Sequence, residues 1–162
     1  MNVLVLVIFL VIHGTAQTPV HIGADNTVAV DFNKNENVKG KRENLIRLPD
    51  GGLILNDHMR PGRMNSDALE LSRPTDVLQT IWVSTMPKDV VAMRVQLSKD
   101  QKNWSDWFVV SDETQLKNIS TLGRLLRGLG GARYVRYDIA IKADPKLLNR
   151  GSIAMLGFVT VD

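Results

Sequence analysis

The sequence predicts an all-β protein, an antiparallel β-sandwich or jelly roll of about eight strands with at most one short helix. Three observations predict it. Apolar and polar residues alternate with a period of two over most of the chain, as in strands that bury one face. The alternating segments are short and are separated by turn-forming residues. Strands and helical patterns do not alternate, which argues against a parallel α/β sheet.

The first half of the chain contains four such segments. Residues 27–32 (TVAVDF) are a short candidate strand. Residues 44–57 (NLIRLPDGGLILND) indicate a hairpin, because the glycines of PDGG accept the positive φ angle of a tight turn. Residues 67–72 alternate cleanly, and residues 76–85 form a longer strand. The charged segment 33–44 (NKNENVKGKREN) is interpreted as a solvated loop.

The second half contains the clearest alternation. Strands are expected over residues 90–98, 133–142 and 151–162, and a short helix over residues 120–131. In the first two of these strands the buried faces would carry Val91, Met93, Val95 and Leu97, and Val135, Tyr137, Ile139 and Ile141.

The N-terminus resembles a secretory signal peptide. An unbroken apolar run over residues 3–12 precedes Gly14 and Ala16, the small residues that signal peptidase prefers. The run is shorter than the roughly 20 residues that span a bilayer. We therefore expect residues 1–16 to be removed and residues 17–162 to form a single β-sandwich domain. The expected location is secreted, periplasmic or at the cell surface, with no membrane attachment after cleavage; an uncleaved anchor is the alternative.

Composition narrows the function further. The chain has no cysteine, which excludes disulfides, thiol catalysis and cysteine-ligated zinc. The net charge of +3 is small and scattered, so no nucleic-acid partner is expected. No Gly-x-Ser-x-Gly, His-Glu-x-x-His or phosphate-binding glycine motif is present. Asp57 and His58 alone do not make a metal site. We expect no catalytic residues, metal site or cofactor, with structural calcium left open.

One hairpin carries two of the three tryptophans. In VQLSKDQKNWSDWFVV, Asp100 can turn the chain by bonding nearby backbone groups. Trp107 and Val109 would then share one strand face, with Phe108 and Val110 on the other.

This hairpin, together with GARYVRYDI, resembles the pattern Ser-x-Asp-Gly-x-x-Trp-x-x-Trp followed by Ala-Arg-Tyr-Val-Arg of galactose-binding-like (discoidin-type) jelly-roll modules. The resemblance covers residues 76–162 and implies that these strands are core parts of a sandwich. The glycine of the family's turn is replaced by Gln101, and no ligand-binding residue of the family can be placed on this sequence.

Strand alternation also predicts a binding patch. If the strands 76–85, 90–98 and 133–142 are neighbours, their polar faces combine an aromatic ring with guanidinium and carboxylate groups. An aromatic ring stacks on the apolar face of a sugar, and forked donors bind hydroxyl or carboxylate oxygens. The candidate ligand-binding residues are Trp82, Arg94, Gln96, Tyr134, Arg136 and Asp138.

The function expected from these observations is that of an exported, non-catalytic sandwich that binds carbohydrate, such as a surface or adhesion module. The first alternative is a structural or protein-binding module of an extracellular assembly, whose partner is an extracellular protein. The second is a small secreted glycan-active enzyme with paired loop carboxylates. A concave surface with aromatic and arginine side chains would favour carbohydrate binding. A flat polar face with an exposed terminal strand would favour the protein-binding module, and two loop carboxylates in one cleft would favour the enzyme.

Overall fold

The computed structural model describes residues 26–34, 37–49, 52–87, 89–110, 131–145 and 151–161. The expected signal peptide and all but the last residue of the expected helix lie outside these ranges. The described residues form strands β1 (Thr27–Asp31), β2 (Gly40–Glu43), β3 (Leu45–Leu48), β4 (Gly52–Leu55), β5 (Gly62–Ser66), β6 (Leu69–Thr75), β7 (Val77–Ser84), β8 (Val91–Ser98), β9 (Phe108–Val110), β10 (Ala132–Ile141) and β11 (Ile153–Val161).

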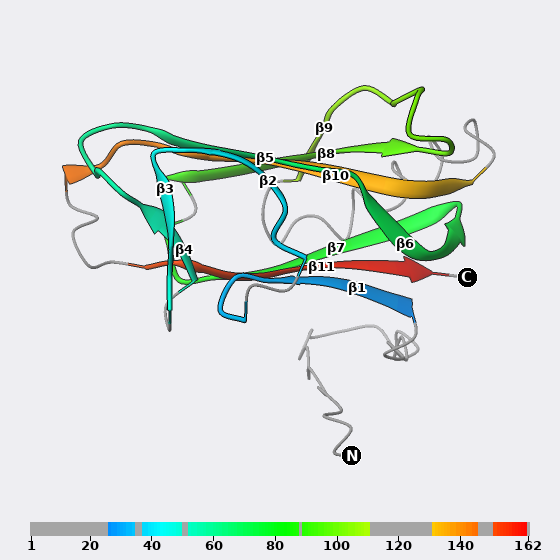
Figure 1. The fold of residues 1–162 in the computed structure, drawn as a ribbon, viewed down its shortest axis with the longest axis horizontal. Helices are drawn as coiled ribbons and strands as arrows, with labels where there is room; N and C mark the ends of the chain where they lie inside the picture. The colour runs from blue at the N-terminus through cyan, green and yellow to red at the C-terminus, as the bar shows by residue number, and fades with distance from the viewer. Residues whose placement is uncertain are drawn as a thin grey trace, which may run out of the picture.

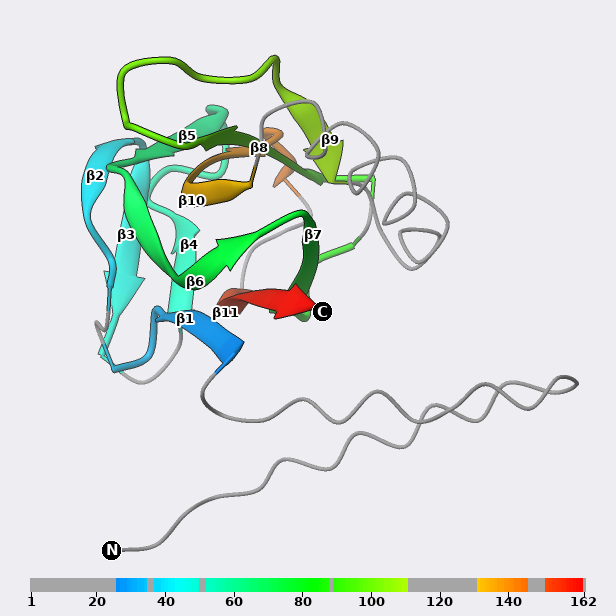
Figure 2. The ribbon, with the colours of Figure 1, turned by 90° about the vertical axis from the view of Figure 1, so that its right-hand side faces the viewer.

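The strands build two antiparallel sheets, and the predicted all-β sandwich is confirmed (Figure 1). The five-stranded sheet has the order β1-β11-β4-β3, with β7 also paired to β11. The six-stranded sheet has the order β2-β5-β10-β8-β9, with β6 also paired to β10. Figure 2 shows β5, β8 and β10 in one layer and β1, β7 and β11 in the other, with β6 running between the layers.

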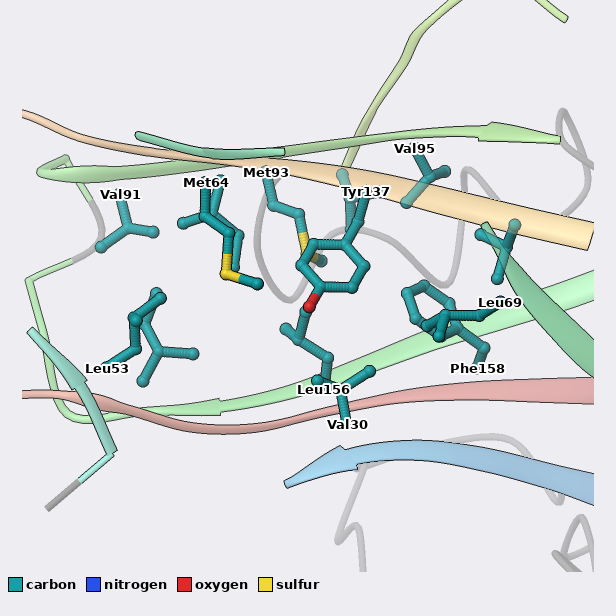
Figure 3. Close-up of a cluster of buried hydrophobic side chains, with 14 of the residues drawn as sticks. Val30, Leu53, Met64, Leu69, Val91, Met93, Val95, Tyr137, Leu156 and Phe158 are labelled. Atoms are coloured by element: carbon teal, nitrogen blue, oxygen red, sulfur yellow. The ribbon is translucent and has the colours of Figure 1, made fainter. Parts of the chain in front are cut away.

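The space between the sheets is filled by apolar side chains (Figure 3). Met93 and Tyr137 from the six-stranded sheet face Leu156 and Phe158 from the other sheet, and all four are fully buried. The rings of Tyr137 and Phe158 stack with centroids 6.1 Å apart. Burying one such side chain contributes about 1.5–3 kcal/mol, so this core holds the sheets together without disulfides.

The alternation predicted for β8 and β10 is confirmed. Every residue expected on their inner faces is buried, namely Val91, Met93, Val95, Leu97, Val135, Tyr137, Ile139 and Ile141. The expected hairpin over residues 44–57 is also present, as the antiparallel pair β3 and β4. The inner residues fix the orientation of β8 and β10, so their intervening positions lie on the outer face of the six-stranded sheet.

Two strands were not predicted. The interpretation of residues 33–44 as a loop is wrong for β2, which pairs with β5, and β5 itself was missed. All four residues of β2 are exposed, so no apolar alternation marks the strand in the sequence. Lys41 and Glu43 form an ion pair of 2.8 Å on it. A short, charged edge strand of this kind discourages further strand pairing.

Candidate functional site

The outer face of the six-stranded sheet brings together five of the six candidate residues. On the adjacent strands β8 and β10, Arg94 lies opposite Asp138, and Gln96 lies opposite Arg136. Tyr134 occupies the same face of β10, two residues before Arg136. Directly opposed residues of an antiparallel pair project to the same side of the sheet. The premise that β8 and β10 are neighbours is therefore confirmed.

Trp82 does not belong to this group, and the prediction that its strand lies beside β8 or β10 is wrong. Trp82 lies in β7, where its backbone partner is Leu156 of the other sheet. On the same face of β7, Leu78 is fully buried, and Thr80 lies opposite the buried Phe158.

Asp138 is the buried centre of the outer face. Its carboxylate accepts hydrogen bonds from Arg63 Nε at 2.7 Å, Arg63 Nη2 at 3.0 Å and Arg94 Nε at 2.6 Å. The side chain of Asp138 is only 4% exposed, whereas those of Arg63 and Arg94 are 46% and 37% exposed. Burial raises the pKa of Asp138, but the hydrogen bonds and charges of the two arginines outweigh it and hold the pKa below its ordinary value. The carboxylate therefore stays ionised and orients both guanidinium groups.

Gln96 fixes the third guanidinium group. Arg136 Nε donates a hydrogen bond of 2.7 Å to Gln96 Oε1. The amide nitrogen of Gln96 in turn donates to the carbonyl oxygen of Ser105, also at 2.7 Å. Gln96 is buried, so its amide acts as a rigid link between β10 and the segment that precedes β9.

Two tryptophans stack with these arginines. The Arg136 guanidinium lies 4.3 Å from the ring centroid of Trp104 and 5.7 Å from that of Trp107. The Arg94 guanidinium lies 4.6 Å from the centroid of Trp107. We call these four residues the Trp-Arg ladder: Trp104, Arg136, Trp107 and Arg94. Cation–π contacts at such distances attract electrostatically, and they hold the arginine side chains close to the sheet.

The turn after β8 positions Trp104. The Asp100 carboxylate accepts hydrogen bonds from the backbone N–H groups of Asn103 at 2.8 Å and Lys102 at 2.9 Å. The backbone and side-chain hydrogen bonds of Asn103, followed by that of Lys102, lower the pKa of Asp100 well below its ordinary value. The indole nitrogen of Trp104 donates to the Gln101 carbonyl oxygen at 3.0 Å. The expected turn at Asp100 is thus confirmed.

Tyr134 lies beside the ladder and not in it. The guanidinium of Arg133 is 5.9 Å from the centroid of the Tyr134 ring. Arg133 also forms an ion pair of 2.8 Å with Glu70. Tyr134 thus adds an aromatic ring at one end of the outer face, next to Arg133, whose charge is paired with that of Glu70.

The sequence interpretation missed Arg63, Trp104 and Trp107 as members of the site. Arg63 was missed because β5 is only five residues long, with Gly62 at one of its inward positions. The sequence did hold a signal for Trp107, since the predicted hairpin puts it on the same face as Val109. In the structure Val109 lies opposite Arg94, so extending the polar face across the hairpin would have included Trp107.

Among the described residues, no three His, Cys, Asp or Glu side chains are grouped so that they could hold a metal ion. In the same residues, no helix is long and apolar enough to cross a membrane. Comparisons with protein-family models, curated proteins and solved structures give no match. The chemistry of the outer face therefore carries the functional argument.

Proposed function

We propose that this protein is a non-catalytic β-sandwich that binds carbohydrate through the outer face of its six-stranded sheet. The Trp-Arg ladder is the observation that carries the proposal. It places two tryptophans and two arginines, all partly exposed, on one face of the six-stranded sheet. Indole rings and guanidinium groups together supply apolar surface and forked hydrogen-bond donors, which are the two kinds of contact that a sugar needs.

The ladder is also held in place before any ligand binds. Asp138 orients Arg94, and Gln96 orients Arg136. Side chains that are already ordered lose little conformational entropy on binding, so more of the contact energy contributes to affinity. The strands beneath the ladder are rigid because their inner faces are fully packed.

Two sequence-based predictions agree with this proposal. A secretory signal at residues 1–16 would bring the protein to extracellular or cell-surface glycans. The resemblance of residues 76–162 to galactose-binding-like modules would favour a sugar ligand. The aromatic contacts proposed for it are Trp104 and Trp107 and not Trp82, the residue expected from the sequence.

A glycan-array screen of the purified protein tests the proposal. We expect binding to at least one class of glycan, and weaker binding by Arg136→Gln, which removes a ladder guanidinium. The matched control is Arg60→Gln, because Arg60 is an exposed arginine in the loop between β4 and β5. Wild-type protein that binds no glycan, or two variants that bind equally well, would contradict the proposal.

A further inference from the structure

The faces of the ladder tryptophans already carry cations. Arg136 lies over Trp104, and both Arg94 and Arg136 lie within 6 Å of the centroid of Trp107, at 4.6 and 5.7 Å. A neutral sugar that stacks on an indole ring needs an open ring face. The guanidinium groups compete for that position, so the exposed remainder of each indole ring gives apolar contact and the arginines give the main polar contacts of this surface.

The arginines still have unused hydrogen-bond donors. Arg94 and Arg136 each use Nε for a bond to the protein, to Asp138 and Gln96 respectively. Within the described part of the chain, the terminal Nη atoms of these two arginines donate no hydrogen bond to a protein group. Both side chains are partly exposed, so these paired charged N–H groups are available as donors, and such pairs match the paired oxygens of carboxylate or sulfate groups.

The same face has more positive than negative charge. Arg63, Arg94 and Arg136 carry three positive charges; in the described residues Asp138 is the carboxylate that bonds to Arg63 and Arg94, and none bonds to Arg136. The neighbouring pairs Lys41–Glu43 and Arg133–Glu70 neutralise themselves at 2.8 Å. Arg136 has no carboxylate partner in the described residues and is bonded to the neutral amide of Gln96, so its charge is the least balanced of the three.

From these three observations we infer that the ligand is an acidic glycan, whose carboxylate or sulfate groups bind the Nη edges of Arg94 and Arg136. This inference rests on the proposed function and narrows it to one class of carbohydrate. Arg63, almost half exposed on β5, extends the same cationic row across the sheet. The ligand is taken to be a polysaccharide because the proposed function is carbohydrate binding, and DNA enters the test as the competing polyanion.

Binding titrations with named polymers test the inference. The probes are heparin for sulfate, polygalacturonate for carboxylate, dextran as the neutral polysaccharide, and double-stranded DNA. We expect binding to heparin or polygalacturonate and none to dextran. Because the contact is between exposed charges, its affinity should fall as the salt concentration rises.

Variants locate the binding to the ladder. Arg136→Gln should weaken binding about tenfold, as expected for the loss of one charge-assisted pair of hydrogen bonds. Arg136→Lys keeps the positive charge but loses the paired N–H donors of the guanidinium group. Its affinity should lie between those of the wild type and Arg136→Gln. Arg60→Gln should bind like the wild type. Circular dichroism shows whether each variant is folded. If a variant does not fold, the comparison of the four polymers on the wild-type protein still tests the inference.

The possible results separate the two proposals. Equal binding to dextran and to the acidic polymers would overturn the acidic-glycan inference and leave the proposed function standing. DNA bound as tightly as the polysaccharides would overturn it as well, because the face would then recognise polyanions in general. Binding to no polysaccharide in this set or on the array would overturn both proposals.

Discussion

Asp138 is the residue on which the outer face depends most, because it is buried and bonded to two arginines. Asp138→Asn would leave both guanidinium groups without their counter-charge and would place an amide donor beside them. We expect the free energy of unfolding to fall by about 2–3 kcal/mol. Urea denaturation followed by tryptophan fluorescence measures it. Asp106→Asn, at an exposed position, is the control and should change stability by less than about 0.5 kcal/mol. Equal effects of the two variants would contradict this account.

The same carboxylate gives stability a defined pH dependence. Since folding lowers the pKa of Asp138, its contribution is complete above its ordinary pKa of 3.8 and is lost as pH falls through the lower, folded value. We expect the free energy of unfolding of the wild type to decrease on acidification below about pH 4. In Asp138→Asn this decrease should be smaller. Identical pH profiles for the two proteins, measured by urea denaturation, would rule out the assigned role.

Gln101 has a backbone conformation that suits glycine better. Its φ angle is 62°, in the left-handed region that L-residues other than glycine rarely adopt. Gln101→Gly should therefore raise the free energy of unfolding, by about 0.5–1 kcal/mol after the greater flexibility of the unfolded chain is subtracted. Thermal unfolding measures the change. A loss of stability would mean that the Gln101 side chain contributes more than the backbone strain costs.

At the scale of single residues, the sequence predicted that Arg94, Gln96, Arg136 and Asp138 lie on the outer faces of their strands, because each lies between strongly apolar residues. It could not predict their partners. The hydrogen bond from Arg63 joins residues 75 positions apart, and only strand order brings them together. Trp82 was misplaced because β7 pairs with β11 in the other sheet, and strand order of this kind is not visible in a local pattern.

At the scale of elements, the segment between β8 and β9 is a platform for the ladder. Ser105 donates its backbone N–H to Leu97 at 2.9 Å, and Trp104 forms a bridge with Ser98. These contacts fold the segment back along β8. They place Trp104 and Trp107 over the arginines that project from β8 and β10.

A double-mutant cycle tests the ladder as an element. Trp104→Leu and Arg136→Gln, singly and together, should reveal a coupling of about 0.5–1 kcal/mol in the free energy of unfolding. The control cycle combines Trp104→Leu with Arg63→Gln, since Arg63 is not stacked on either tryptophan. That coupling should lie within about 0.5 kcal/mol of zero. Two equal couplings would show that the stacking contact has no energetic role.

Most strands could be predicted because they bury one face, and alternation reports burial. The strands β2 and β5 were not predicted for two different reasons: β5 buries one face but is only five residues long, with Gly62 at an inward position. The residues of β2 are all exposed, and the strand exists only through its pairing with β5. Pairing of this kind depends on residues distant in sequence, which a local pattern does not contain.

At the scale of the whole molecule, the sandwich separates two tasks. The inner faces of both sheets form the core, and the outer face of the six-stranded sheet carries the ladder. The five-stranded sheet contains β7 and therefore Trp82. The three tryptophans of the chain thus report on two different sheets, two on the proposed binding face and one on the opposite layer.

The measurement that tests the central claim most directly uses this division. In an NMR titration of ¹⁵N-labelled protein with the most tightly bound glycan from the array, the three tryptophans give separate indole N–H signals. We predict that the signals of Trp104 and Trp107 shift with increasing glycan concentration while that of Trp82 stays in place. A titration that moves the Trp82 signal and leaves the other two unchanged would contradict the claim that the Trp-Arg ladder is the binding surface.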